Sequence, residues 1–538
     1  MISVKNKFLI FRILITLLFA FLFFYVALPP INVTSMDFWF YLLFVVIVYF
    51  GTAVINVINF NNIFTNINIK KTVFKTAVVP TIIFGVFVLI FVLNFILSPV
   101  FRSDAYSKRI TINEDAEFIT DVKEVDFSAL PLLDKESSQK LGDRVMGQMP
   151  ELVSQFYVSS LYTQINYNDK IVRVTPLEYD GFFKFFTNRK EGVKGYITVD
   201  SVSGESELTK LDKGMKYMPS AMFSKDLYRH LRFNYPTEIF DVECFEIDNE
   251  GNPYWIIPTV KYDGVGIKKE ITGVIILDPI TGESKKYKTK DVPTWVDHVY
   301  SAELLIEQVD DWGKYKNGFL NSIFGQKNVV QTTDGYNYTV MNDDVYMYTG
   351  ITSAAADEAN LGFILSNMRT KETVFYKVPG AEEYSAMRSA EGQVQQMNYT
   401  ASFPLLINLN NRATYLLSLK DNAGLVKMYA FVDVKDYQKV VVTDASKGIE
   451  VAANNYLNNA EDLVDKDNVI EKEITIKNIL SAVIDGNTYY YITDTNNQKY
   501  RISIKVDKKR VPFLSTNQTI KIKYSNESDV IEIIELSE

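Results

Sequence analysis

Cysteine and histidine are almost absent from this chain of 538 residues. Cys244 is the only cysteine, which excludes an internal disulfide and a thiolate metal cage. His230 and His298 are the only histidines. Two histidines without cysteine partners make a poor zinc site, so we expect no metal and place both side chains at the surface or at the edge of the core.

Motifs of catalytic chemistry are also missing. The chain has neither a Gly-x-Ser-x-Gly turn nor a glycine-rich phosphate loop. The acid pairs Asp310-Asp311 and Asp343-Asp344 lack the alternating oxygen ligands of a calcium-binding loop. The sequence therefore predicts a protein that is not an enzyme and that has no catalytic residue, no metal and no cofactor.

Charge is scarce in the first hundred residues. Six Lys or Arg and one acid, Asp37, give residues 1–100 a net charge of +5, and the whole-chain charge of −9 leaves −14 for residues 101–538. An acidic part of that size repels phosphate backbones. We therefore expect no nucleic acid among the partners of this chain.

Long apolar runs take the place of charge in the first hundred residues. They cover about residues 8–28, 38–60 and 73–101. At about 1.5 Å per residue, each is long enough to cross a hydrocarbon layer of ~30 Å. The first run could instead be a cleavable signal peptide, but it is too long for one and Leu28-Pro29-Pro30 follows it. The sequence predicts a three-helix membrane anchor over residues 1–101.

Cations give this anchor an orientation. Lys5, Lys7 and Arg12 flank the first run, three lysines at 70, 71 and 75 lie between the second and third, and the 29–37 loop has no cation. The positive-inside rule then places the N-terminus and the 61–72 loop in the cytoplasm. We expect a multi-pass protein of the cell membrane with its C-terminal domains, residues 102–538, extracytoplasmic. No acid, histidine or lysine lies mid-run, which favours an anchor over a transporter.

A β-hairpin followed by a helix recurs in the soluble part. Residues 171–211 and 253–289 each place Tyr-Asp-Gly before the hairpin and Asp-x-x-[Ser/Thr]-Gly-Glu at its turn. We expect Gly204 and Gly282 to take the positive φ that closes such a turn without a β-carbon penalty. Four such units in a row predict tandem packing. Two weaker copies without the glycine complete the series, at residues 345–378 and 414–444.

A strand, an Asp-x-x-Thr-Gly-Glu turn, a strand and a helix in this order resemble the PepSY domain, a small α+β module of exported bacterial proteins. Three apolar runs followed by several such units also resemble bacterial membrane proteins with extracytoplasmic PepSY-like repeats. The resemblance covers about half of the chain. It implies a role in restraining peptidases or in sensing at the cell envelope.

Residues 471–538 differ in character from the repeats. Short alternating strands follow an acidic linker at about 455–470, and turns at Asp485-Gly486-Asn487 and Thr495-Asn496-Asn497 separate them. Five strands in so short a stretch predict a small β-barrel that resembles an OB-like or SH3-like fold.

The predicted fold class is thus three N-terminal transmembrane α-helices, α+β extracytoplasmic repeats built from an antiparallel hairpin plus a helix, and a small C-terminal β-barrel. The predicted domains are a membrane anchor (1–101), a stalk strand and helix (102–165), two PepSY-like repeats (166–312), two weaker repeats (313–460) and the barrel (471–538).

This layout predicts a non-enzymatic cell-envelope protein that is anchored in the membrane and presents a tandem-repeat binding surface outside it. The alternative is a PepSY-type regulator or inhibitor of an extracytoplasmic peptidase. Besides the membrane itself, the expected partner is an envelope protein or a cell-wall component. The sequence gives no oligomeric state.

The connection at residues 314–348 is the candidate partner site. It is rich in Tyr, Asn, Gly and Gln, with little charge before Asp343. Rigid rings beside adaptable amides suit contact surfaces, although the same residues could belong to the core of the third repeat. The predicted partner-binding residues are Phe319, Phe324, Gln326, Gln331, Tyr336 and Tyr338.

Overall fold

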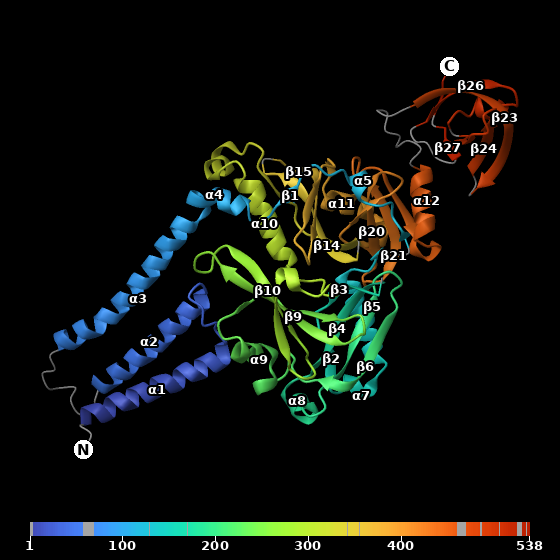
Figure 1. Ribbon diagram of the computed structural model, residues 1–538. Helices are drawn as coiled ribbons and strands as arrows, with labels where there is room; N and C mark the ends of the chain where they lie inside the picture. The colour runs from blue at the N-terminus through green and yellow to red at the C-terminus, as the bar shows by residue number, and fades with distance from the viewer. Residues whose placement is uncertain are drawn as a thin grey trace. The chain divides into compact units, whose positions relative to one another are not determined.

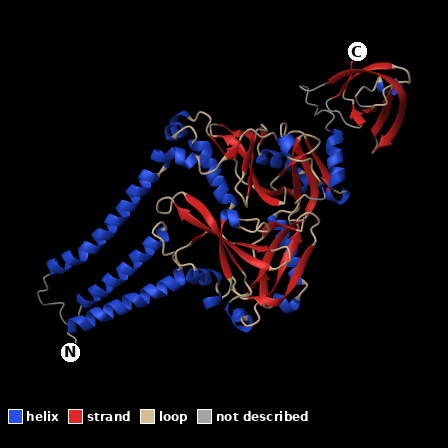
Figure 2. Cartoon of the chain, viewed as in Figure 1, coloured by secondary structure: helices blue, strands red, loops and turns tan. Residues whose placement is uncertain are grey.

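A computed structural model describes most of the chain, in two compact units, Met1–Val440 and Val441–Glu538. Outside the N-terminal helices both units consist mostly of strands (Figure 2). Parts of three sequence predictions lie outside the described residues: the 61–72 loop, the 455–470 linker and the turn at Asp485. The structure describes residues 4–57, 69–127, 130–168, 170–341, 343–354, 356–459, 470–484, 487–504, 506–524, 530–533 and 535–537.

Four helices begin the chain (Figure 1): α1 (Val4–Ala27), α2 (Met36–Val57), α3 (Ile69–Leu97) and α4 (Pro99–Ser107). Within the described residues, Leu9–Ala27 is the one helical stretch that by length and composition could cross a membrane alone. Met36–Thr52 is a shorter apolar helix. Thr81–Leu97 and Pro99–Ser107 would count as a span only as a pair bent by 52°. The three-span anchor predicted from the sequence is therefore wrong.

Local chemistry explains the bend between α3 and α4. Ser98 has the extended dihedrals φ −70° and ψ 166°, and Pro99 follows it as the first residue of α4. Proline has no N–H to donate to the preceding turn, and its ring excludes the residue before it from the helical region. The apolar run at 73–101 consequently forms two helices where the sequence predicts one.

The C-terminal end of α1 is held by α9 (Leu227–Asn234). Arg229 Nε donates to Tyr25 O at 3.1 Å and Arg232 Nε donates to Leu28 O at 2.9 Å. Carbonyls at a helix C-terminus have no helical N–H to accept from, and a cation there is favoured by the helix dipole. The two arginines therefore cap α1 and fasten it to the β-rich part.

Four antiparallel sheets follow one strand order within the first unit. In each, two short strands pair in succession with one edge of a long strand, and the next strand pairs with its other edge. Because successive strands are neighbours, each sheet forms from a short stretch of sequence.

The strands of the first two sheets are β2 (Phe156–Val158), β3 (Thr163–Tyr167), β4 (Lys170–Tyr179), β5 (Val193–Asp200), β6 (Ser206–Met215), β7 (Ile239–Phe240), β8 (Cys244–Ile247), β9 (Pro253–Tyr262), β10 (Lys269–Leu277) and β11 (Ser284–Lys288). Those of the next two are β12 (Val330–Thr332), β13 (Asn337–Met341), β14 (Asp344–Ser353), β15 (Ala356–Asn367), β16 (Thr373–Tyr376), β18 (Thr400–Ala401), β19 (Leu405–Asn408), β20 (Ala413–Lys420) and β21 (Val426–Asp433). The long strands are β4, β9, β14 and β20. Two small strands extend the third sheet, β1 (Ile112–Asn113) beside β16 and β17 (Gly380–Ala381) beside β15.

Helices connect these sheets. They are α5 (Phe118–Asp121), α6 (Lys135–Gly147), α7 (Pro150–Val153), α8 (Phe182–Asn188), η2 (Phe223–Lys225), η3 (Thr289–Asp291), α10 (Ala302–Tyr315), the π-type turn η4 (Asn321–Gly325), α11 (Glu383–Gln393) and η5 (Gln395–Met397). The sequence predicts a helix directly after the hairpin of the second repeat, but α10 begins only at Ala302, after an irregular segment.

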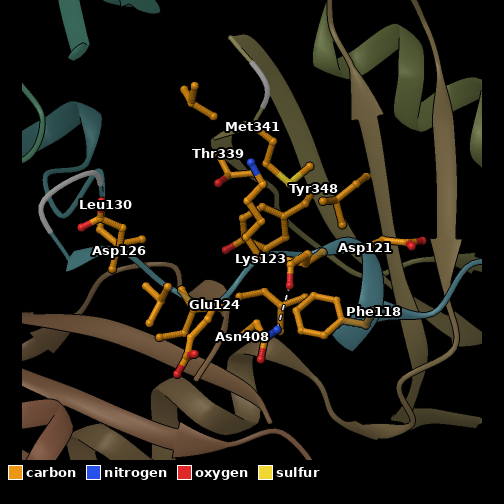
Figure 3. Close-up of a pocket in the computed structure, with 16 residues that line it drawn as sticks. Phe118, Asp121, Lys123, Glu124, Asp126, Leu130, Thr339, Met341, Tyr348 and Asn408 are labelled. Carbon is orange, nitrogen blue, oxygen red and sulfur yellow. Dashed lines mark hydrogen bonds between the residues drawn. The ribbon is translucent and has the colours of Figure 1, made fainter. Parts of the chain in front are cut away.

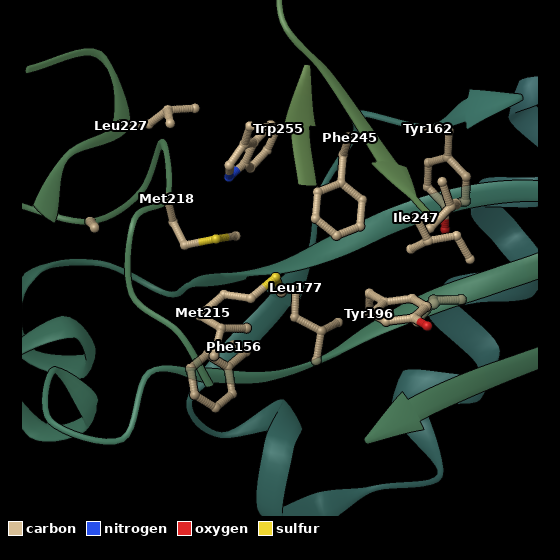
Figure 4. Packing of buried hydrophobic residues seen from close by; sticks show 14 of the residues in the cluster. Phe156, Tyr162, Leu177, Tyr196, Met215, Met218, Leu227, Phe245, Ile247 and Trp255 are labelled. Atoms are coloured by element: carbon tan, nitrogen blue, oxygen red, sulfur yellow. The ribbon is translucent and has the colours of Figure 1, made fainter. Parts of the chain in front are cut away.

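The largest core cluster belongs to the first two sheets together (Figure 4). Phe245, Ile247 and Trp255 of the second sheet pack in one cluster with Leu177 and Tyr196 of the first. Large apolar side chains on both faces of the interface exclude water, which is the main favourable term in folding. The two best-matched repeats therefore fold as a pair and not as separate modules.

The second unit holds a single sheet with the strand order β27-β25-β24-β23-β26-β28. Among the described residues its two ends are β27 and β28, so these strands form an open path where the sequence predicts a small β-barrel. The elements from the unit boundary onward are β22 (Val440–Asp444), η6 (Ala445–Lys447), α12 (Ile449–Asn459), β23 (Ile470–Ile484), β24 (Asn487–Asp494), β25 (Lys499–Ser503), η9 (Val511–Phe513), β26 (Thr519–Tyr524), β27 (Val530–Glu532) and β28 (Glu535–Ser537).

The fold class predicted from the sequence is accordingly wrong as a whole. A hairpin plus a helix was expected for each repeat, whereas each repeat is an antiparallel sheet with two further short strands on its long strand. Strands of two to five residues are too short to show an alternating pattern, and they form because the long strand offers them an edge.

The two glycine turns are confirmed. Gly204 has φ 76° and Gly282 has φ 83°. At the second turn Asp278 Oδ1 accepts the N–H of Ile280 at 2.7 Å, and Gly282 N donates to Asp278 O at 2.8 Å. The aspartate thus satisfies the turn's own backbone, and glycine supplies the left-handed residue.

The surroundings of the two glycines differ, which gives a testable difference in stability. A β-carbon at Gly282 would overlap the Tyr217 ring, whereas one at Gly204 would meet Leu133 Cδ1 at 3.4 Å. We expect Gly204→Ala to lower the unfolding free energy by about 1 kcal/mol through backbone strain alone. Gly282→Ala should lower it by about 1–3 kcal/mol more because of the overlap. Denaturant unfolding of both variants measures this, and equal losses would contradict the assigned contact.

Candidate functional site

A segment that we call the strap, residues 118–126, crosses from the third sheet to the fourth. Asn408, at the end of β19, holds it in place. Its Nδ2 donates to Val122 O at 2.7 Å and to Ile119 O at 3.4 Å, and its backbone O accepts the N–H of Val125 at 2.8 Å. The strap therefore depends on one amide for most of its fixed contacts with the fourth sheet.

A pocket of about 230 Å³ lies under the strap (Figure 3). Its walls are largely apolar, and its rim carries the charged side chains of the strap. This strap pocket is lined by Phe118, Asp121, Val122, Lys123, Glu124, Val125, Asp126, Leu130, Thr339, Val340, Met341, Tyr348, Leu365, Leu406, Ile407 and Asn408.

Two buried polar atoms in this lining lack a hydrogen-bond partner among the described residues. They are Oη of Tyr348 and Oδ1 of Asn408, whose residues are 1% and 2% exposed. An unpaired buried polar group costs about 1–3 kcal/mol. Both atoms are closed to solvent in this structure, so a water or a ligand group reaches them only if the lining of the strap pocket moves aside.

Burial raises the pKa of Tyr348 well above 10, although the backbone of Leu406 and the side chain of Asn337 lie near enough to lower it. The phenol is therefore neutral at physiological pH and can donate or accept a hydrogen bond. The bonds of Asn408 Nδ2 to the strap identify the other side-chain atom as the amide oxygen, which only accepts hydrogen bonds.

The rim of the strap pocket is acidic. Asp121, Glu124 and Asp126 outnumber Lys123, and all four side chains are exposed. Exposed charges are screened by solvent and salt, so they attract a ligand of opposite sign more than they fix its position. The rim favours a cation over an anion.

A buried carboxyl lies close enough to Tyr348 to act on it electrostatically. Glu383, at the start of α11, is 0% exposed and acts electrostatically on Tyr348. Burial raises the pKa of Glu383 to about 7, against weaker lowering by its own backbone, Thr333 and Gly350. At neutral pH the carboxyl is close to half protonated.

A second pocket, of about 200 Å³, contains two of the residues predicted from the sequence. Tyr336 and Tyr338 line it, with their rings 5.6 Å apart at 73°. Tyr336 Oη donates to Glu303 Oε1 at 2.8 Å, and both rings pack against the core of the third sheet. The hydroxyl of Tyr336 is thus satisfied internally. We call this the tyrosine pocket.

The other four predicted residues are not brought to this pocket. Phe319 stacks on Tyr315 at 6.4 Å near the end of α10. Phe324 is largely exposed on η4, and Gln326 follows it with φ 45°. Gln331 pairs with Thr352 inside the third sheet. The six side chains predicted as one partner site therefore occupy separate places, and partner binding at any of them stays a prediction.

His298, which lines the tyrosine pocket, belongs to a segment that joins the first two sheets. Glu246 of β8 accepts the N–H of Asp297 at 2.9 Å and of His298 at 3.0 Å. Asp297 Oδ2 accepts the N–H of Asn166 at 2.8 Å, and His298 Nε2 donates to Gln164 O at 2.7 Å. One irregular segment thereby links β8 of the second sheet to β3 of the first.

Burial controls the charges in this junction. It raises the pKa of Glu246 and of Asp297, and each carboxyl opposes ionisation of the other. Burial also lowers the pKa of His298 to about 4. His298 is therefore a neutral, buried side chain, and the prediction that placed it at the surface or the edge of the core is wrong. Cys244 lines the same pocket, and burial raises the pKa of its thiol, so it is not a reactive thiolate.

Sequence reasoning missed the strap pocket entirely. The strap lies in a stretch read as a stalk, and Tyr348 and Asn408 lie on strands of two different repeats. Only the fold brings these residues together. The acids at 121, 124 and 126 are the one local signal, and a run of acids alone is usually a solvated surface.

Comparison with known proteins gives little guidance. No family model matches the chain, and no curated protein matches it. A GH43_1 enzyme from Xanthomonas citri matches 67% of this chain and 87% of its own, with 10% identity and a TM-score of 0.18. An alpha-L-arabinofuranosidase from Lactobacillus brevis matches 71% and 98%, with 9% identity and a TM-score of 0.14. A Synechocystis apocarotenoid oxygenase mutant matches 69% and 59%, with 8% identity and a TM-score of 0.14.

These matches correct one prediction. The solved structures named above are enzymes, so the expectation that the chain is not an enzyme is no longer held. TM-scores this far below 0.5 give the chain neither their fold nor their activity.

The buried carboxyl of Glu383 gives a prediction for pH. Below pH 4.5 the group is protonated in the folded and the unfolded chain, and between pH 4.5 and about 7 it is protonated only in the folded chain. Unfolding then releases a proton, so the contribution of Glu383 to the free energy of unfolding falls as the pH rises through that range. Relative to Glu383→Gln, the wild-type protein should lose roughly 3 kcal/mol of unfolding free energy between pH 4.5 and 7, and no more above it.

Unfolding free energies of both proteins at several pH values measure this difference. Glu382→Gln is the control, because Glu382 pairs at 3.3 Å with the exposed Arg388 at the surface. That pair should contribute less than about 1 kcal/mol at any pH. A difference between wild type and Glu383→Gln that does not change with pH would mean that the Glu383 carboxyl is solvated.

Proposed function

We propose that this chain is a membrane-anchored protein of the cell envelope. In this proposal α1 crosses the membrane once, the β-rich part lies outside the cytoplasm, and the strap pocket binds a small organic cation, an ammonium group on a short apolar chain. Such a group can be free or belong to an envelope component.

The coupling of α1 to the sheets supports the anchoring. A helix that only targets the chain for export and is then removed needs no fixed contacts with the folded part. Here Arg229 and Arg232 cap its last turn, and the edge of the Phe233 ring packs at 5.7 Å against Phe24. The lysines at positions 5 and 7 favour a cytoplasmic N-terminus.

The unpaired atoms Tyr348 Oη and Asn408 Oδ1 carry the binding proposal. The asparagine oxygen can accept a hydrogen bond from a ligand that displaces the lining in front of it, and the acidic rim favours a positive charge. Apolar walls such as Val340, Leu365 and Ile407 favour a hydrocarbon portion. An alkylammonium ion combines all three properties.

Binding of hexylammonium, with hexanol and hexanoate as matched probes, tests the site. We expect hexylammonium to raise the melting temperature and the other two to have a smaller effect or none. Tyr348→Phe removes a hydroxyl without a partner, so it should leave stability unchanged or slightly raised and weaken hexylammonium binding about tenfold.

Tyr415→Phe is the matched control. Tyr415 is also fully buried, but its Oη donates to Ala381 O at 2.9 Å. Its loss should lower the unfolding free energy by about 1 kcal/mol and leave hexylammonium affinity unchanged. Equal effects of the two substitutions on hexylammonium affinity would show that the ligand does not bind next to Tyr348.

Orientation is tested with a reporter that is active only outside the cytoplasm, fused to the C-terminal end of this sequence. We expect an active reporter in the membrane fraction. Replacing Lys5 and Lys7 by Glu should lower reporter activity, because these lysines set the orientation of α1. An active reporter in the soluble fraction, on a chain shortened at its N-terminus, would instead identify α1 as a cleaved signal sequence.

A further inference from the structure

Three phenylalanines on the surface of the β-rich part lie far more exposed than apolar side chains usually do. Phe182 and Phe183, at the start of α8, are 49% and 81% exposed, and Phe223 of η2 is 53% exposed. Phe186 joins them, with its ring 4.7 Å from Phe182 and 6.0 Å from Phe223. We call these four residues the aromatic ridge. A contiguous apolar patch of this kind indicates an interaction surface.

The backbone of Phe223 has an unusual conformation. Phe223 has φ 56°, a left-handed conformation that is strained for a residue with a bulky side chain. Such strain persists only where the surrounding structure over-determines it. Arg229 supplies one such constraint, because its Nη1 donates to Phe223 O at 2.8 Å.

The same arginine connects the aromatic ridge to α1. While Nη1 of Arg229 binds Phe223 O, its Nε binds Tyr25 O at 3.1 Å, and its guanidinium lies 4.3 Å over the Tyr25 ring. One guanidinium therefore holds Phe223 next to the last turn of α1. Figure 1 shows α9, which carries Arg229, at the end of α1.

This position determines what can cover the aromatic ridge. The side chains of α1 that face outward are mainly large and apolar, up to Val26 in its last turn. In the proposed anchoring, Tyr25 and Val26 then lie where the hydrocarbon layer meets water. A surface held against that turn by one side chain lies at the same depth.

Charge near the aromatic ridge fits the same location. Lys184 interrupts the four phenylalanines of α8, and Arg189 and Lys190 follow directly after the helix. Aromatic rings beside cations are the combination that lies in the headgroup layer of a bilayer, where rings enter the boundary and cations meet lipid phosphates. A soluble protein partner would need no such depth.

From these contacts we infer that the aromatic ridge inserts into the outer surface of the membrane that α1 crosses. The lipid interface is the occupant of this patch, and the β-rich part lies against the membrane on the α8 side. This inference rests on the proposed anchoring by α1.

Depth-dependent fluorescence quenching tests it on the full chain in vesicles of phosphatidylcholine and phosphatidylglycerol. Single cysteines in a Cys244→Ser background carry the fluorophore, at Leu17→Cys in α1, Phe183→Cys in the aromatic ridge and Phe324→Cys on η4. Phe324 is the matched control, because it is 82% exposed and Phe183 is 81% exposed. The quenchers are nitroxides fixed in the headgroup or in the middle of the acyl chain, and iodide in water.

We expect the label at 17 to be quenched by the mid-chain nitroxide and the label at 183 by the headgroup nitroxide. Headgroup quenching at 183 should exceed that at 324 about threefold or more, and iodide should show the opposite order. A label at 183 that behaves like the label at 324, while 17 is quenched from within the bilayer, would overturn the inference and leave the anchoring intact. A label at 17 that only iodide reaches would overturn the anchoring, and the inference with it.

A second variant tests the same inference without a fluorophore at position 183. Phe182 and Phe183 replaced together by Ser lose only exposed rings, so the fold should not change. With the fluorophore at Phe223→Cys, this double substitution should reduce headgroup quenching about threefold, whereas Phe324→Ser should leave it unchanged. Unchanged quenching in the double variant would mean that the rings do not hold this side at the membrane.

Discussion

One buried carboxylate, Glu246, joins three sheets, and the arrangement of the β-rich part depends on it. Its two oxygens accept the N–H groups of Asp297 and His298. Both of these residues bind the first sheet, and the next two N–H groups of the segment donate to Met368 O at the edge of the third sheet. Four successive N–H groups of a segment with no helix or strand of its own are thus bonded, and unpaired buried N–H groups would be costly. Replacing Glu246 by an apolar residue would leave two such groups unpaired and the three sheets without their common contact.

Local chemistry could be read from the sequence where it is complete within a few residues. The turns at Gly204 and Gly282 were predictable because Asp-x-x-x-Gly carries its own acceptor and its own left-handed residue. The third repeat has the same turn without the glycine: Asn367 Oδ1 accepts the N–H of Arg369 at 2.9 Å, and Lys371 takes φ 69°. A search for glycine at this position therefore underestimates how similar the third repeat is to the first two. Contacts that Lys371 makes with residues outside the turn offset the strain of its positive φ. Lys371 Nζ donates to Arg109 O at 2.7 Å, from a residue more than 260 positions away.

Structural features that depend on contacts between residues far apart in the chain could not be predicted from the sequence. The short strands that complete each sheet have no pattern of their own. The helix expected after the second hairpin begins only at Ala302, because Glu246 takes N–H groups of the segment before it. Tyr336 and Tyr338 were identified by composition and do line a pocket, but composition cannot separate a contact ring from a core ring. The strap pocket was invisible for a related reason. Its unpaired atoms, on Tyr348 and Asn408, become neighbours only when the third and fourth sheets meet.

The strap pocket and the tyrosine pocket differ in how their polar groups are hydrogen-bonded. This difference decides which of them is the better candidate for a binding site. In the tyrosine pocket Tyr336 binds Glu303 and His298 binds the first sheet, so a ligand would have to replace bonds that already exist. At the strap pocket Asn408 uses its N–H groups to hold the strap, and its buried oxygen has no hydrogen-bond partner among the described residues. One amide thus holds the strap and keeps an unused acceptor in the wall behind it. A ligand that donates to this oxygen would polarise the amide and strengthen its hydrogen bonds to the strap. In the proposed binding, a ligand that reaches this oxygen would couple occupancy of the pocket to the position of the strap through a single side chain.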